Sequence, residues 1–380
     1  MAALSVAALA GTAFAGIGDT IVYTSFNDNS IKAVFNPGGS NTVQTLVNYG
    51  GAPFSAGNIR LSGIAQGNNG KWYVGNGPIV AGDDNWATSA IFEVSDLFGS
   101  PTTTNFLAGS PVQNPIDVDF DATGNLLWIQ NPFRRTSPAQ VVNDGIYGSS
   151  VNIPAAAAFF TETAAGARPF YEAGVYLTKD PNSSDYFVTA LNGGVGLPGQ
   201  PIDDDSSSTL WRLSPNFANP AASTLTLVHD FTGATQGETA VQIRGITAVP
   251  GTNELYVTNN VSGFPYPAGQ VWNGAPAGVY RITLDNNGNF LSKTLINGNI
   301  LQPEAIEYNP FTGKLVISSF NDLNGNQLPE EGRIYQMNLD GSGLEVIVEG
   351  DFARDFEFVP TPGTIFVGAL AGLAGLRRRR

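Results

Sequence analysis

Five side chains near the C-terminal end of the chain supply oxygen donors at a spacing typical of calcium-binding loops. They are Asp322, Asn324, Asn326, Glu330 and Glu331. Calcium takes about six to eight oxygen ligands, which alternating Asp and Asn side chains on a tight turn can provide. We therefore predict that this segment binds Ca²⁺. The alternative is an ordinary polar turn, because Gln327 and Arg333 stand where an EF-hand loop carries Gly and Glu.

Other polar and aromatic side chains in predicted loops are candidates for ligand contact. Asp203, Asp204 and Asp205 form an acidic run, for which a solvated loop is the alternative interpretation. Trp86 and Trp272 also fall in predicted loops, where an indole ring can stack on a sugar. The remaining tryptophans inside predicted strands are expected in the core.

The sequence offers few groups for nucleophilic or transition-metal catalysis. It contains no cysteine and a single histidine, His229, which we expect on the surface at the end of an outer strand. A Ser-His-Asp triad and a thiolate site are therefore not expected. The formal net charge is −14, and residues 1–376 carry 14 basic against 32 acidic groups, or −18. Such an acidic body repels nucleic acid, so we predict no nucleic-acid partner.

The body of the chain repeats one pattern, in which alternating apolar residues flank a turn of Gly, Pro or Asn. Each repeat predicts a β-hairpin. The hairpins cover residues 63–76, 117–131, 174–190, 245–259 and 305–319. Third strands are expected at 90–94, 209–213, 278–282 and 333–337, and fourth strands at 224–228 and 344–348. Four strands per unit predict an all-β fold, a β-propeller.

The two ends of the body complete each other. Residues 20–28 match residues 314–322, including an identical Ser-Phe-Asn-Asp, and so read as a second strand without a first. Residues 354–359 read as a first strand without a second. Pairing them closes the ring and covers its edges. We predict six blades, with seven as the alternative because residues 132–170 are hard to divide into strands.

This strand plan resembles six-bladed propellers of the NHL, YWTD and gluconolactonase-like kinds. Glu304 precedes a predicted innermost strand and is similar in place to the metal-binding glutamate of gluconolactonase-like propellers. Arg244 and Arg354 occupy the equivalent place in other blades, so the alternative is a set of structural ion pairs at the channel mouth.

The predicted loops are uneven in length. The turns between first and second strands are tight, whereas the second and third strands are joined by long segments at 76–89, 132–170, 191–208, 259–277 and 321–332. All of these would open on one face of the propeller. Such one-sided growth indicates a working surface, and neutral drift is the alternative.

Both termini read as targeting signals. Residues 3–14 form an apolar run, and Ala13 and Ala15 give a small-x-small cleavage site, so residues 1–15 are a predicted signal peptide. The C-terminal segment begins with Val359, Pro360, Thr361 and Pro362, continues as an apolar run, and ends with Arg377, Arg378, Arg379 and Arg380. A short hydrophobic helix with a terminal arginine cluster predicts transient contact with the inner membrane.

This C-terminal layout resembles the PEP-CTERM sorting signal, with Thr361 in place of the usual Glu. The resemblance implies processing by an exosortase-type enzyme and residence at the cell surface or in the extracellular matrix. The predicted domains are thus a signal peptide (1–15), a propeller (16–358) and a sorting signal (359–380). We expect a non-enzymatic protein that binds extracellular polysaccharide or a surface protein through its long-loop face. The alternative is a calcium-dependent hydrolase or lactonase of the gluconolactonase-like type.

Overall fold

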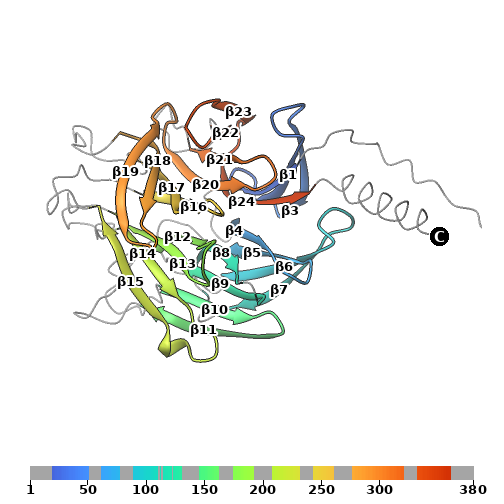
Figure 1. Cartoon of the computed structure of the whole chain (residues 1–380). Helices are drawn as coiled ribbons and strands as arrows, with labels where there is room; N and C mark the ends of the chain where they lie inside the picture. Colours follow the sequence, from blue (N-terminus) through green and yellow to red (C-terminus); the bar gives the residue numbers. More distant parts are fainter. Residues whose placement is uncertain are drawn as a thin grey trace, which may run out of the picture.

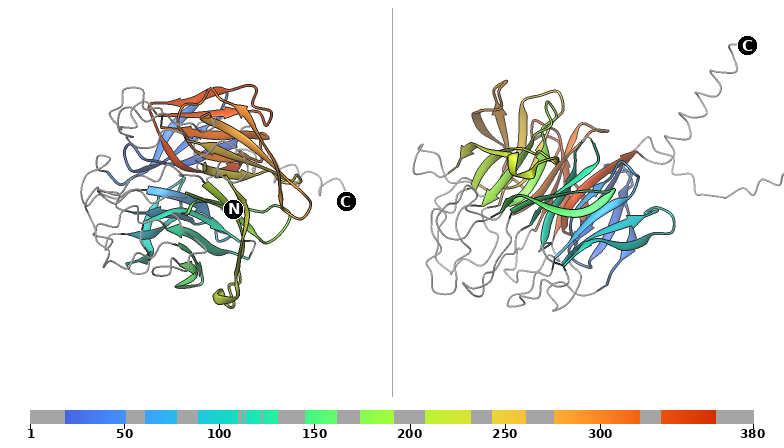
Figure 2. Two further views of the ribbon diagram at one scale, coloured as in Figure 1. Left: turned by 90° about the vertical axis from the view of Figure 1, so that its left-hand side faces the viewer. Right: turned by 90° about the horizontal axis from the view of Figure 1, so that it is seen from below.

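A computed structural model gives the fold of the chain (Figure 1). It describes residues 19–50, 61–77, 89–109, 112, 114–121, 123–130, 145–161, 174–191, 208–231, 243–260, 276–320 and 332–360. Within these ranges the strands form six four-stranded antiparallel sheets arranged around a common axis (Figure 2). The prediction of a six-bladed propeller is confirmed, and the alternative of seven blades is wrong.

Three blades are built from the first half of the chain together with the last strand. From the channel outward, blade 1 consists of β24 (Ala353–Pro360), β1 (Asp19–Ser25), β2 (Ser30–Phe35) and β3 (Thr42–Asn48). Blade 2 consists of β4 (Leu61–Gln66), β5 (Trp72–Asn76), β6 (Ala90–Ser95) and β7 (Thr102–Ala108). Blade 3 consists of β8 (Pro115–Phe120), β9 (Asn125–Gln130), β10 (Gly145–Ser150) and β11 (Ile153–Thr161).

The second half of the chain builds the other three blades. Blade 4 consists of β12 (Gly174–Lys179), β13 (Tyr186–Leu191), β14 (Ser208–Ser214) and β15 (Thr224–Asp230), with a 3₁₀ turn η2 (Pro220–Ala222) before β15. Blade 5 consists of β16 (Ile243–Ala248), β17 (Glu254–Asn259), β18 (Gly278–Leu284) and β19 (Phe290–Asn297). Blade 6 consists of β20 (Pro303–Asn309), β21 (Lys314–Ser319), β22 (Arg333–Met337) and β23 (Glu345–Glu349).

The predicted closure of the ring is confirmed by the pairing of β1 with β24. Thr20 lies opposite Val359 and Asp19 lies opposite Pro360 in this antiparallel pair. The strand therefore extends two residues beyond the predicted end of the propeller at residue 358. Val359 and Pro360, the first residues of the predicted sorting signal, belong to the last sheet strand.

The alternating apolar residues of each strand pack between neighbouring blades, which places a hydrophobic layer at every junction. Trp72 and Trp128 are fully buried, as the sequence predicted for tryptophans within strands. Trp128 also stacks on Tyr147 with ring centroids 5.7 Å apart. Burial of such large rings is a major contribution to the stability of the junctions.

Hydroxyl side chains of second strands tie neighbouring blades together near the channel. Thr24 Oγ1 donates to the Ser62 carbonyl at 2.5 Å. Thr189 Oγ1 donates to the Arg244 carbonyl at 2.8 Å, and Thr258 Oγ1 donates to the Glu304 carbonyl at 2.5 Å. Each bond joins the second strand of one blade to the innermost strand of the next. These bonds satisfy buried backbone carbonyls that the sheets leave free.

Two predictions need correction or fall outside the described residues. The Ala-rich stretch of residues 155–158 was expected in a loop, but it lies in β11 and pairs with β10. These alanines are exposed or half-buried in the outermost strand of blade 3. The predicted C-terminal helix falls in residues 361–380, outside the described residues. In the part of the chain that is described, no helix is long and apolar enough to cross a membrane.

Candidate functional site: the central channel

Most of the predicted site residues fall outside the described residues. These are Asp322, Asn324, Asn326, Glu330, Glu331, Trp86, Trp272, Asp203, Asp204, Asp205, Ala13, Ala15, Thr361, Pro362 and the four terminal arginines. Glu304 is described, and it lies at the start of the innermost strand β20. The candidate site described below therefore consists of channel residues whose side-chain contacts the structure describes.

Glu304, Arg244 and Arg354 form the channel mouth on the side where second strands end. Arg354 Nη1 lies 3.3 Å from Glu304 Oε1, and Arg244 Nε lies 3.9 Å from Glu304 Oε2. Asn260 Nδ2 donates to Glu304 Oε2 at 2.8 Å. Both carboxylate oxygens of Glu304 thus have partners from the protein. The alternative that the sequence offered for Glu304, an ion-pair network, is confirmed.

Aromatic rings hold Arg354 in place. Its guanidinium carbon lies 4.6 Å from the centroid of the Phe26 ring and 5.2 Å from that of Phe352. The two rings contact each other edge to face at 5.9 Å. A guanidinium that faces rings and a carboxylate retains its charge at low cost in solvation.

Tyr176 spans the channel just inside the mouth. It belongs to β12 of blade 4, and its hydroxyl donates to the Arg354 carbonyl of blade 1 at 3.0 Å. Burial raises the pKa of Tyr176 well above its usual value, and the negative charge of Glu304 raises it further. The phenol therefore stays protonated and serves as a hydrogen-bond donor. It separates the channel mouth from the region beneath it.

Five carboxyl groups lie beyond Tyr176 on the innermost strands of blades 1, 3 and 6. This carboxyl cluster consists of Asp117, Asp119, Glu307, Asp355 and Glu357. Asp117 Oδ2 accepts the backbone N–H of Leu177 at 2.7 Å. Asp355 Oδ2 accepts the N–H of Ile64 at 2.8 Å. Each of these two carboxyls reaches the innermost strand of the next blade.

The other members of the cluster lie nearer the short-turn end. Thr247 Oγ1 donates to Glu307 Oε2 at 2.9 Å, and the Gln66 N–H donates to Glu357 Oε2 at 3.3 Å. Burial raises the pKa of Asp119 to about 6. Burial, aided by the charge of Asp119, raises the pKa of Glu357 to about 7, and burial raises the pKa of Glu307 well above its usual value. The cluster thus contains groups that titrate near neutral pH.

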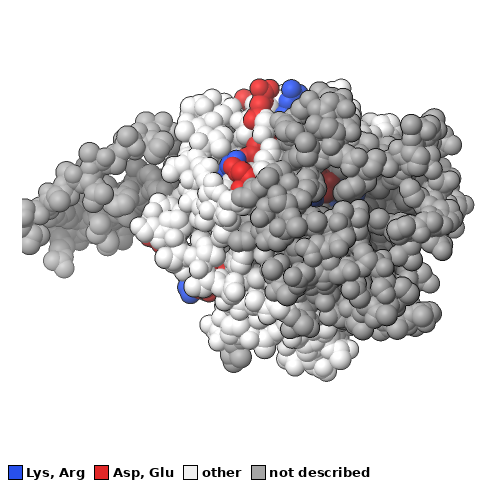
Figure 3. Space-filling view, turned by 180° about the vertical axis from the view of Figure 1, so that it is seen from behind, with Lys and Arg blue, Asp and Glu red and all other residues white. Residues whose placement is uncertain are grey.

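The carboxyl cluster was missed by the sequence analysis, although a signal was present. Acidic residues alternate with apolar ones in two innermost strands, at 117 and 119 and at 355 and 357, and a third innermost strand carries acids at 304 and 307. Such positions are buried in a propeller, so repeated acids there indicate a polar channel rather than a solvated face. By contrast, few of the described side chains on the face in Figure 3 are charged, and the group near its upper edge contains both signs.

The arrangement of the cluster does not amount to a metal centre. Among the described residues, no group of three or more His, Asp or Glu side chains is arranged to hold a metal ion. The backbone N–H groups and Thr247 already supply donors to Asp117, Asp355 and Glu307. What the geometry provides is a set of acids on the innermost strands, of which Asp117 and Asp355 are buried and the other three are half-buried.

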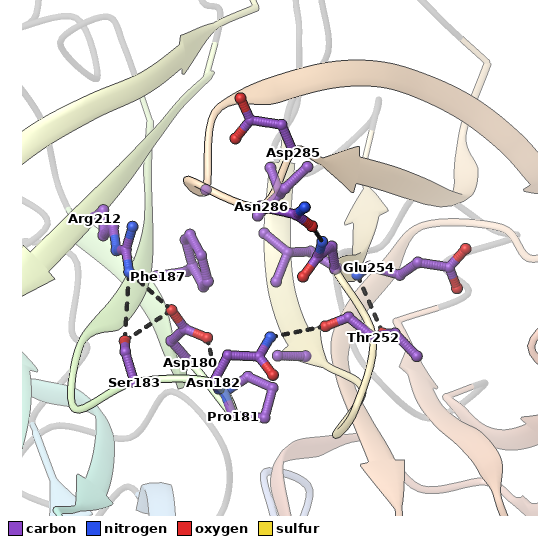
Figure 4. A pocket seen from close by; sticks show the side chains of 15 residues that line it. Asp180, Pro181, Asn182, Ser183, Phe187, Arg212, Thr252, Glu254, Asp285 and Asn286 are labelled. Carbon is purple, nitrogen blue, oxygen red and sulfur yellow. Dashed lines mark hydrogen bonds and ion pairs between the residues drawn. The ribbon is translucent and has the colours of Figure 1, made fainter.

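A cavity of about 110 Å³ lies between blades 4 and 5 on the short-turn side (Figure 4). Its rim carries Arg212, whose guanidinium lies 3.1 Å from Asp180 and 2.7 Å from Asp185. Asn182 Nδ2 donates to the Thr252 carbonyl across the gap at 2.9 Å. Because these polar groups satisfy one another, the cavity is an interblade junction rather than a binding site for a charged ligand.

His229 is not the surface residue that the sequence predicted. Its ring is buried between blades 4 and 5, stacked on Phe290 at a centroid distance of 3.6 Å. It also contacts the edge of Phe231 at 4.6 Å. The outermost strand curves toward its neighbour, so the ring packs in the junction. It lies far from the channel, as expected.

Comparison with known proteins supports the propeller fold but does not establish a function. No protein-family model matches this sequence, and no curated protein matches it. A chain in a nidogen–laminin complex covers 90% of this chain and 98% of its own length, with 11% identity and a TM-score of 0.55. TolB from Acinetobacter baumannii covers 90% and 67%, with 12% identity and a TM-score of 0.50.

A luciferin-regenerating enzyme matches in the same way. It covers 88% of this chain and 91% of its own, with 11% identity and a TM-score of 0.50. The neighbours differ in kind, and identities this low establish the propeller fold alone.

Proposed function

We propose that this chain is an exported propeller that binds a ligand at the cell surface or in the extracellular matrix without catalysis. The observation that carries the proposal is the channel mouth, where Arg244 and Arg354 both lie within ion-pair distance of Glu304. A propeller whose entrance is filled by protein side chains serves as a rigid frame. Its variable parts are then the loops, which supply the contacts.

The competing function, a calcium-dependent lactonase, requires a metal at the same place. Glu304 and two or three Asn or Asp residues from other blades would have to converge within about 2.5 Å of one ion. Glu304 instead lies against Arg354 and Asn260, and a guanidinium at 3.3 Å repels a cation. This geometry favours the binding function.

The ligand-binding face would be formed by the long loops between second and third strands. Trp86 and Trp272 are the aromatic groups proposed to stack on sugar rings of an extracellular polysaccharide. Asp203, Asp204 and Asp205 would bind hydroxyl groups or the basic side chains of a surface protein. The loop from Asp322 to Glu331 would bind Ca²⁺ and fix the shape of the face.

The proposed route to the surface uses both termini. A signal peptide of residues 1–15 would direct export, and an exosortase-type enzyme would process the segment that follows the propeller. Because β24 ends at Pro360, cleavage after Pro360 would leave the ring closed. Cleavage before Val359 would remove two residues that pair with β1.

A binding assay tests the proposal directly. The chain from Gly16 to Pro360, which contains all the described strands, is passed over immobilised extracellular polysaccharides with and without Ca²⁺. We expect retention that falls about fivefold or more in W86A and W272A, since each lost aromatic contact contributes about 1–3 kcal/mol. F311A is the matched control, because Phe311 is half exposed in a turn at the opposite end of blade 6. Retention unchanged in the two tryptophan variants, or turnover of a lactone, would contradict the proposal.

The calcium loop has its own test. A ligand that binds only the folded state raises the melting temperature, so adding chelator should lower it. D322A should melt at the chelator-treated temperature whether or not Ca²⁺ is present. An unchanged melting temperature of the unsubstituted protein in chelator would remove calcium from the proposal and leave polysaccharide binding untouched.

A further inference from the structure

Asp117 and Asp355 approach each other although they belong to strands of different blades. Asp117 lies on β8 of blade 3 and Asp355 on β24 of blade 1, with β4 of blade 2 between them. At this level β4 contributes Gly63, which has no side chain. A Cβ there would lie 2.6 Å from the Asp117 Cα and 2.5 Å from the Val118 nitrogen. The missing side chain lets the backbone of β8 approach β4 closely at Asp117.

The two carboxyls are buried beside the same peptide unit with no described cation between them. Both side chains are about 95% buried. Asp117 accepts the N–H groups of Val118 and Leu177, and Asp355 accepts those of Phe356 and Ile64. A Cβ on Gly63, the neighbour of Ile64, would lie 2.6 Å from the Asp117 Cα, so both residues flank the Gly63–Ile64 peptide. A carboxylate has no donor, so a hydrogen bond between the two carboxyls needs a proton on one of them.

The surroundings favour keeping this proton. On the same strands, Asp119 and Glu357 add negative charge, and β20 contributes Glu307. The strand β4 between them carries no titratable side chain, and neither does β9.

The positively charged side chains near the pair interact with other acids. On β12, the Tyr176 phenol is neutral, and the Lys179 ammonium acts on Asp119. Arg354 and Arg244 at the mouth are paired with Glu304. On β1, Tyr23 donates to Asp351 at 3.0 Å and so faces away from the pair. No described cation pairs with Asp117 or Asp355.

We propose that Asp117 and Asp355 share one proton and form a pH-sensitive latch that holds β24, the strand that closes the ring, against the neighbouring blades. Loss of the proton places two negative charges side by side in the channel. Their repulsion pushes Asp355 away from the Ile64 N–H of blade 2. The latch thus couples the external pH to the strand that precedes the predicted sorting signal.

The sign of the pH effect follows from the raised pKa values of the pair. Burial raises the pKa of both carboxyls above the value of about 4 that Asp has in the unfolded chain. The stabilisation is therefore complete below about pH 4 and is lost as pH rises through the folded-state values. Each pH unit over which the folded protein holds one extra proton changes the unfolding equilibrium constant about tenfold.

Urea denaturation of the full chain at about pH 5 and about pH 8 tests the latch. We expect the unsubstituted protein to have the lower midpoint at about pH 8. D117N and D355N should each reduce this difference, because an amide can donate to the remaining carboxyl without a shared proton. The double variant should reduce it no further than either single variant. If the reduction in the double variant equalled the sum of the two single reductions, each carboxyl would bind its own proton, and the shared proton would be ruled out.

D351N is the matched control. Asp351 is equally buried and is paired with Lys32 at 2.8 Å rather than with another acid. Its substitution should lower the midpoint at both pH values and leave the difference between them intact. If D351N also reduced the difference between the urea midpoints at the two pH values, the pH effect would not come from Asp117 and Asp355.

Two measurements on the unsubstituted protein do not depend on the variants folding. Infrared spectroscopy near neutral pH should show the carbonyl stretch of a protonated carboxyl, and its absence would overturn the proposal. Hydrogen exchange, corrected for the intrinsic rate at each pH, should show protection of β24 falling more than that of β13 as pH rises. Equal losses in the two strands would rule out a latch on β24.

Discussion

The two ends of the central channel stabilise their acidic side chains in different ways. At the channel mouth, Glu304 lies between Arg244 and Arg354, so a negative group is matched by positive ones. In the carboxyl cluster beyond Tyr176, five acids face mainly one another and backbone N–H groups. The first region is balanced by countercharge and the second by protonation. The comparison teaches that one channel can hold its acids by countercharge at one end and by protonation at the other.

Removing the negative charge from the mouth should have the largest effect of the variants that test this comparison. In E304Q, the buried Arg244 and the half-buried Arg354 lose their common carboxylate and repel each other. We expect a loss of about 3 kcal/mol in the free energy of unfolding, of the size seen when one partner of a buried pair is removed. The loss should be similar at about pH 5 and about pH 8. Urea denaturation at both pH values measures it.

E349Q provides a matched surface control for E304Q. Glu349 lies 3.9 Å from Arg333, but its side chain is 74% exposed. An exposed pair of this kind contributes about 0–1 kcal/mol. If E304Q were no more destabilising than E349Q, the mouth would not depend on its countercharge and the comparison would fail.

The fold could be predicted from the sequence because short local patterns mark its strands and turns. Apolar alternation and turn residues mark each hairpin, and the shared Ser-Phe-Asn-Asp identifies the strand left without a partner. The placement of Glu304 beside two arginines was also foreseen, because all three occupy equivalent places in their blades. These inferences need only the repeat and its register.

The carboxyl cluster could not be predicted in the same way. Asp117 and Asp355 are far apart in sequence, and they flank a third strand, β4, which β8 approaches closely at Gly63. No local pattern encodes that coincidence. His229 was misplaced for a related reason, since its burial depends on Phe290 of the next blade. Contacts between blades are set by packing rather than by the repeat.

Filling the space at Gly63 should have an intermediate effect. In G63A the added methyl group would meet backbone atoms of Val118 and Asp117, which cannot move aside as a flexible side chain would. We expect a loss of about 2 kcal/mol, typical of overpacking. Because the methyl group would also push Asp117 away from β4, the strand whose Ile64 N–H binds Asp355, the difference in stability between about pH 5 and about pH 8 should shrink.

G298A is the matched control for the added methyl group. The nearest atom to a Cβ at Gly298 is Leu295 Cδ2 at 3.5 Å, an ordinary contact. Its stability should change by no more than about 0.5 kcal/mol. A G63A protein with full stability and an unchanged pH difference would show that the close approach at blade 2 does not shape the cluster.

The smallest effect is expected at Tyr176, the residue that separates the two regions. In Y176F the Arg354 carbonyl loses its donor, which should cost about 1 kcal/mol. At three other junctions a threonine of the preceding blade donates to the equivalent carbonyl, but at the junction of blades 6 and 1 the buried Ser318 hydroxyl has no partner among the described residues.

S318A should therefore be nearly neutral, whereas T258V should resemble Y176F. Both comparisons use urea midpoints at one pH, because the Tyr176 phenol stays protonated across the range that titrates the carboxyl cluster. If S318A were costly and Y176F neutral, Ser318 would hold the Arg354 carbonyl in solution. Tyr176 would then not be the element that divides the balanced mouth from the protonated cluster, and the boundary between the two regions would have to be drawn elsewhere.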